Sequence, residues 1–91
     1  MVDIFHDVED AEAHEKFVKW LDRNPDGFYI NCKTARDMVL HRSSCFHASP
    51  LELGSLTKNR KACSSNWHKL DDWVTEQSGK LRICRDCAPT T

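Results

Sequence analysis

The sequence has no long apolar run, and this absence limits the classes of protein to which it can belong. No stretch of its 91 residues approaches the roughly 18 to 20 apolar residues that a membrane-spanning helix needs, so no membrane association is expected. The N-terminal residues Met1–Asp7 lack the basic start and apolar core of a secretory signal. Internal repeats and low-complexity tracts are also missing. We therefore expect a cytoplasmic protein.

Motifs of common catalytic sites are missing as well. The chain has no HExxH pair, no Ser-His-Asp spacing and no glycine-rich loop that would hold a phosphate, and it contains only three glycines. So short a chain also leaves little room for a pocket of enzyme dimensions. The sequence therefore predicts a protein that is not an enzyme.

Size and composition indicate one small domain, residues 1–91, that needs help to stay folded. Apolar residues make up 40% of the chain and charged residues 30%, which is ordinary globular composition. A chain this short buries only somewhat more than about 60% of its unfolded surface, so an apolar core alone is marginal. Five cysteines without an export signal are unlikely to form a disulfide framework, and an odd number cannot all pair internally. Metal binding is the natural role for them.

The hydrophobic pattern predicts an α+β domain with two main helices and a small, mostly antiparallel sheet. Apolar residues recur at helical spacing over residues 8–22, an acidic stretch, and again over 66–78. Alternation and short apolar runs predict strands at 28–33, 38–41, 62–63 and 81–83.

Two short cysteine motifs together predict one zinc site. Cys84-x2-Cys87 has the spacing at which two thiolates grip a tetrahedral ion, and His41-x3-Cys45 supplies a second pair of ligands. A redox role for the CxxC motif is disfavoured, because Ala88-Pro89 follows it instead of a helix N-terminus that would lower a thiol pKa. We therefore expect one structural Zn²⁺ that joins residues 38–87 into a zinc-stabilised half.

The sequence leaves the identity of one ligand open. Cys63 can replace His41, although its place beside Ala62 also suits a small buried side chain. His47 forms a tighter Cys45-x-His47 pair and ranks below both. Cys32 is expected in the core, because it alternates with apolar residues of a strand.

The second half of the chain resembles the metal-binding domain of the Ada-type bacterial DNA alkylation-repair proteins. The matching features are the strand end Leu40–Cys45, the helix between Ser64 and Gly79, and the approach Leu81–Ile83 to the CxxC motif. The resemblance implies a zinc ion, a small mixed α/β fold and contact with DNA. In that family the methyl acceptor is the first cysteine of a Cys-x3-Cys pair, and His41 stands there in this chain. Methyl transfer is therefore not expected, and four protein ligands indicate a closed, structural site.

Charge is divided unevenly along the chain, and this suggests a partner. Residues 1–26 hold eight acids and three bases, whereas residues 27–91 hold ten bases and six acids. Basic side chains around the predicted zinc half are candidates for phosphate contacts with nucleic acid. These candidates are Arg42, Lys58, Arg60, Lys61, Arg82 and Arg85. The alternative is a monomeric accessory domain that binds a protein partner, for which three tryptophans in so short a chain offer contact area.

Overall fold

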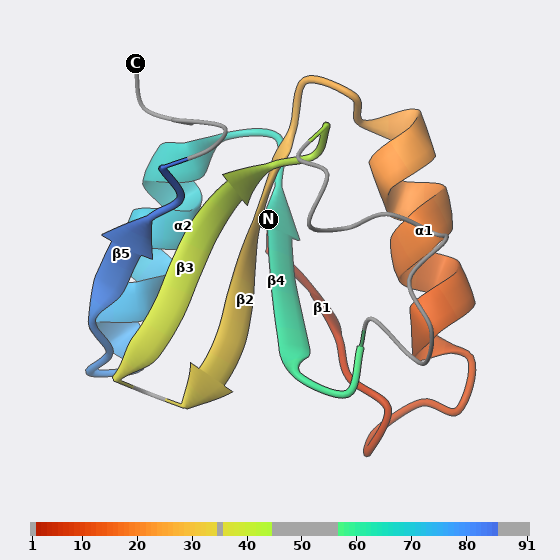
Figure 1. Ribbon diagram of the computed structural model, residues 1–91, viewed down its shortest axis with the longest axis horizontal. Helices are drawn as coiled ribbons and strands as arrows, with labels where there is room; N and C mark the ends of the chain where they lie inside the picture. The colour runs from red at the N-terminus through yellow and green to blue at the C-terminus, as the bar shows by residue number, and fades with distance from the viewer. Residues whose placement is uncertain (1, 35, 45–56, 86–91) are drawn as a thin grey trace.

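Five strands form one sheet in the structure, a computed structural model that describes residues 2–34, 36–44 and 57–85 (Figure 1). The strands are β1 (Asp3–Phe5), β2 (Phe28–Thr34), β3 (Asp37–Arg42), β4 (Arg60–Ser64) and β5 (Leu81–Ile83). Their order in the sheet is β1-β4-β2-β3-β5. All neighbours are antiparallel except β3 and β5, which run parallel. With helices α1 (Ala13–Arg23) and α2 (Trp67–Glu76), the predicted α+β class and its mostly antiparallel sheet are confirmed.

The two helices pack on opposite faces of the sheet. In Figure 1, α2 lies behind β3 and β5, and α1 lies on the side of β1. On the α2 face, Leu70 and Val74 pack on a cluster of strand residues that includes Ile30 and Leu40. On the α1 face, Phe17 packs on buried residues of β2 and β4. Successive residues of a strand point to opposite faces, so the sequence position of each strand residue decides which helix it meets.

The first helix begins later than the predicted range 8–22. Before Ala13 the chain makes turns in which the amides of Glu9 and Asp10 both donate to the carbonyl oxygen of His6, each at 3.1 Å. The acidic residues of this segment suit the start of a helix. In the structure, however, the first residues of the segment form turns instead. The prediction was therefore wrong by five residues at this end.

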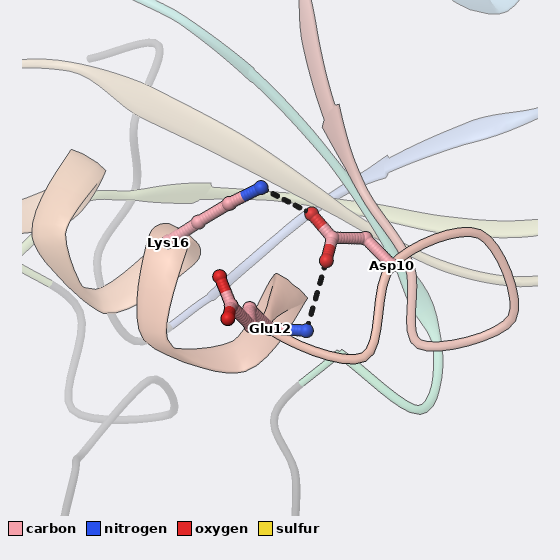
Figure 2. A network of polar contacts seen from close by, with 3 residues as sticks. All are labelled: Asp10, Glu12 and Lys16. Carbon is pink, nitrogen blue, oxygen red and sulfur yellow. Dashed lines mark hydrogen bonds and ion pairs between the residues drawn. The ribbon is translucent and has the colours of Figure 1, made fainter.

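Asp10 explains where the turn gives way to the helix (Figure 2). Its carboxylate accepts the amide hydrogen of Glu12 at 2.9 Å and an ammonium hydrogen of Lys16 at 2.6 Å. A short acidic side chain that bonds a nearby amide competes with the helical ladder, which favours a turn there. The hydrogen bond from Lys16 also lowers the pKa of the Asp10 carboxyl group.

The second helix lies within the predicted range 66–78 and has well-defined ends. Asn66 caps its start, because its side-chain oxygen accepts the amide hydrogen of His68 at 2.9 Å. After Glu76, the last residue of α2, Ser78 adopts a left-handed conformation with φ of 53°. This reversal turns the chain back toward the sheet, where β5 pairs with β3.

Strand β1 was not predicted from the sequence. It has three residues, too few for a visible alternation, and pairs with β4 through the register Asp3–Cys63 and Phe5–Lys61. The indole of Trp20 donates a hydrogen bond to the carboxylate of Asp3 at 3.2 Å, which ties α1 to this edge of the sheet.

Candidate metal centre

The parallel pairing of β3 and β5 brings two predicted zinc ligands together. Leu40 pairs with Ile83, and the amide of Cys84 donates to the carbonyl oxygen of Leu40 at 3.0 Å. This bond continues the ladder by one residue and places Cys84 opposite His41. Neighbouring strands lie about 4.8 Å apart, a separation compatible with two side chains that bind one ion.

His41 and Cys84 also lie on the same face of the sheet. Opposite residues of paired strands share a face, and His41 follows Leu40, which belongs to the α2 face. The two ligand candidates therefore belong to the α1 face. Both are buried, with exposed fractions of 6% for His41 and 5% for Cys84. Histidine and cysteine are the two side-chain types that structural zinc sites use as ligands.

Aromatic packing fixes the ring of His41. It stacks on Tyr29 with 4.8 Å between the ring centroids and 19° between the planes. Tyr29 is 1% exposed and meets Phe17 of α1 edge to face at 5.3 Å. The imidazole is thus oriented by a column of rings that begins in the helix.

The other two predicted ligands, Cys45 and Cys87, lie outside the described residues, as does the alternative ligand His47. Three residues separate His41 from Cys45 in the sequence, and two separate Cys84 from Cys87. Within residues 2–34, 36–44 and 57–85, no group of three or more His, Cys, Asp or Glu side chains is arranged to hold a metal ion. Two of the four predicted ligands fall in those ranges.

Cys63 is in the wrong place to act as a ligand beside Cys84. It shares the α1 face, but Tyr29 of β2 pairs with Cys63 on one side and with His41 on the other. Two strand spacings, about 10 Å, therefore separate Cys63 from His41, and a third separates it from Cys84. Its side chain is fully buried, packs with Phe17, and burial raises the pKa of its thiol. Cys63 is a core residue.

Cys32 is in the core as predicted. It is 6% exposed and belongs to the cluster under α2 with Ile30 and Met38. Burial raises the pKa of its thiol, although the nearby Arg60 opposes that shift. Both properties favour a neutral thiol that packs against apolar neighbours.

The six basic candidates do not gather on one surface. Arg42 lies opposite Phe28, and Arg60 lies opposite Cys32, four residues further along β2. About 13 Å of sheet separates those two levels. Arg85, one residue beyond Cys84, is exposed at the end of the sheet where Arg42 lies.

The remaining basic candidates are engaged in different ways. Lys61 is only 7% exposed and donates to the side-chain oxygen of Asn31 at 2.6 Å on the α1 face. Arg82 is ion-paired with Asp37. Lys58 is exposed in the turn before β4, and Arg60 is half-buried on the α2 face. Strand alternation thus separates Arg60 and Lys61, which are adjacent in the sequence.

These features define a small α+β domain in which a five-stranded mixed sheet has one helix on each face and a buried histidine and a buried cysteine at one edge. No protein-family model, no curated protein and no solved structure matches the chain. In the described part of the chain, no helix is long and apolar enough to cross a membrane.

Proposed function

We propose that the chain is a small zinc-binding module in which His41, Cys45, Cys84 and Cys87 hold one structural Zn²⁺. The observation that supports this proposal is the placement of His41 and Cys84, buried side by side where two parallel strands end. From these ends the chain continues directly toward Cys45 and Cys87, so the four donors can converge within a few residues of the sheet.

Strand β5 is weakly attached to the sheet, so a bound ion would stabilise the fold at this edge. This strand has three residues, and its last residue, Ile83, is 40% exposed. Within β5, Leu81 packs against the core cluster under α2. So little buried apolar surface stabilises this edge of the sheet poorly, and an ion bound by residues at the ends of β3 and β5 holds the two strands together. Four protein ligands leave no open position for substrate, which agrees with a role without catalysis.

The metal content of the purified protein tests this proposal. We expect one zinc ion per chain by elemental analysis, and thiolate charge-transfer bands when Co²⁺ replaces it. Cys45→Ser, Cys84→Ser and Cys87→Ser should each lose the ion or bind it at least about tenfold more weakly. The matched control is Cys63→Ser, a buried thiol of the same sheet face, which should keep the full metal content. Full zinc in Cys84→Ser, or loss of zinc only in Cys63→Ser, would contradict the ligand set.

Contact with nucleic acid is the second part of the proposal. The positions of the basic residues limit which of them can make that contact. The observation in its favour is the group of basic side chains at the start of β4, where Lys58 is exposed and Arg60 is half-buried. Lys61 and Arg82 already have carboxamide and carboxylate partners, so we assign them no direct contact.

A fluorescence titration with short single-stranded and duplex DNA tests this contact. We expect binding at low salt that weakens as salt rises, because each phosphate contact releases about one counterion. Because few basic side chains are available, we expect the binding constant to depend only weakly on salt, with a slope of about two to three in a log–log plot. Lack of affinity at low salt, or an affinity that salt does not change, would leave the zinc module as a protein-interaction domain.

A further inference from the structure

A shallow basic cavity lies at the opposite end of the sheet from His41 and Cys84. It forms where β2 ends and β4 begins, and has a volume of about 190 Å³. Its lining residues are His6, Cys32, Lys33, Thr34, Lys58, Asn59 and Arg60. Cys32 and Arg60 pair across neighbouring strands, and His6 follows β1, the strand on the other side of β4. Three adjacent strands and two turns therefore border this cavity.

The lining of this cavity is positive. Lys33, Lys58 and Arg60 are its basic lining residues, and Thr34 and Asn59 are its neutral polar ones. None of the described residues that line it is acidic. Within the described part of the chain, these three cations form no ion pair with a carboxylate. An anion in this cavity is therefore attracted by the basic lining residues, and no described lining residue carries a negative charge that would repel it.

Arg60 is held in position for such an anion. Its guanidinium carbon lies 5.2 Å from the centroid of the Trp73 ring of α2. This cation–π contact restrains the guanidinium group, whose N–H groups can donate to two oxygens of one anion. The volume is below the range of about 300–1,000 Å³ typical of pockets for drug-sized ligands, so the cavity suits a small anion.

We propose that this cavity binds a phosphate group through Arg60, Lys58 and Lys33. A planar guanidinium matches the oxygens of phosphate, and two lysines add point charges around it. The inference deepens the nucleic-acid contact proposed above and does not depend on the zinc site. The phosphate belongs to an inorganic ion, a nucleotide monoester or a nucleic-acid backbone, and the experiment separates these sources.

The test is a titration of the full-length, zinc-replete protein by two-dimensional amide NMR at constant ionic strength. The probes are inorganic phosphate, a nucleoside 5′-monophosphate and a short single-stranded oligodeoxynucleotide. We expect saturable shifts at the amides of Lys33 and residues 58–60. Arg60→Gln and Lys58→Gln should each weaken the binding of all three probes about tenfold, because each removes a charge-assisted hydrogen bond. Lys58 is exposed, so its variant tests the proposal even if Arg60→Gln fails to fold.

The matched control is Lys19→Gln, an exposed lysine of α1 on the other side of the sheet, which should leave the binding unchanged. Tighter binding of the oligonucleotide than of the monophosphate identifies a nucleic-acid backbone as the source. Equal or tighter binding of the smaller probes identifies a free phosphate or a monoester, and then the cavity assignment stands although the nucleic-acid contact fails. Equal shifts with chloride, no saturation, or equal weakening by Lys19→Gln would overturn the proposal.

Discussion

Chelation of zinc from the purified protein is expected to unfold the domain, including the whole stretch from residue 38 to residue 87. Structural zinc sites in small domains bind with about 10–16 kcal/mol of apparent free energy at neutral pH. The net stability of a typical folded domain is only about 5–15 kcal/mol. The metal term is therefore as large as the entire stability, and without it the remaining interactions are not expected to maintain the fold.

The structure indicates why loss of the metal should spread beyond its ligands. Loss of a bound ion should loosen the short strand β5 from β3, since the paired register covers three residues of each strand. β3 is then an edge strand, and its buried residues Met38 and Leu40 lose neighbours on the α2 face. His41 would also lose the ion as an anchor, although its stack on Tyr29 does not depend on the metal.

Circular dichroism during titration with a strong chelator measures this effect, and added Zn²⁺ should restore the spectrum. Cys84→Ser should reproduce the unfolded spectrum without chelator. The matched control is Cys32→Ser, which alters another buried thiol of the sheet, yet should keep the metal and unfold only when chelator is added. A chelator-treated protein that is metal-free and keeps a cooperative thermal transition near that of the untreated protein would refute the structural role of zinc.

The sequence predicted the strands better than their arrangement. Alternation at 28–33 and the apolar run at 38–41 are local features, and the structure has strands at both places. The start of α1 was missed because the local hydrogen bonds of Asp10 outweigh the helical pattern around it. The order β1-β4-β2-β3-β5 arises from contacts between distant segments, which periodicity does not encode.

That strand order decides which cysteine is a plausible ligand. In the sequence, His41 is the preferred ligand and Cys63 its alternative, because both lie in or beside short strands. Strand β2 lies between β3 and β4, and its residue Tyr29 separates Cys63 from the edge that holds His41 and Cys84. The basic residues do not lie together for a similar reason. Strand alternation places the side chains of Arg60 and Lys61 on opposite faces of the sheet.

Replacement of Tyr29 by leucine is expected to weaken both the fold and the metal site. The Tyr29 ring is buried between Phe17 and His41, so a smaller side chain leaves a gap and removes two ring contacts. We expect a loss of about 2–3 kcal/mol in the free energy of unfolding. The imidazole of His41 also loses the surface that orients it, and changes to groups that orient a metal-bound histidine typically weaken metal binding about 10–100-fold.

A variant on the opposite face separates these two effects. Leu70→Ala removes a fully buried side chain under α2 and should cost about 2–5 kcal/mol, but it leaves the stack on His41 intact. Because zinc binding is coupled to folding, both variants should lower the apparent zinc affinity by their loss of stability. In Tyr29→Leu, the apparent zinc affinity should fall about tenfold further than the loss of stability explains. The ligand-field bands of its Co²⁺ form should also shift. Tyr29→Phe retains the ring and should keep the original band positions. Identical Co²⁺ spectra for Tyr29→Leu and Leu70→Ala, with affinity losses explained by stability alone, would remove Tyr29 as a positioning residue for His41.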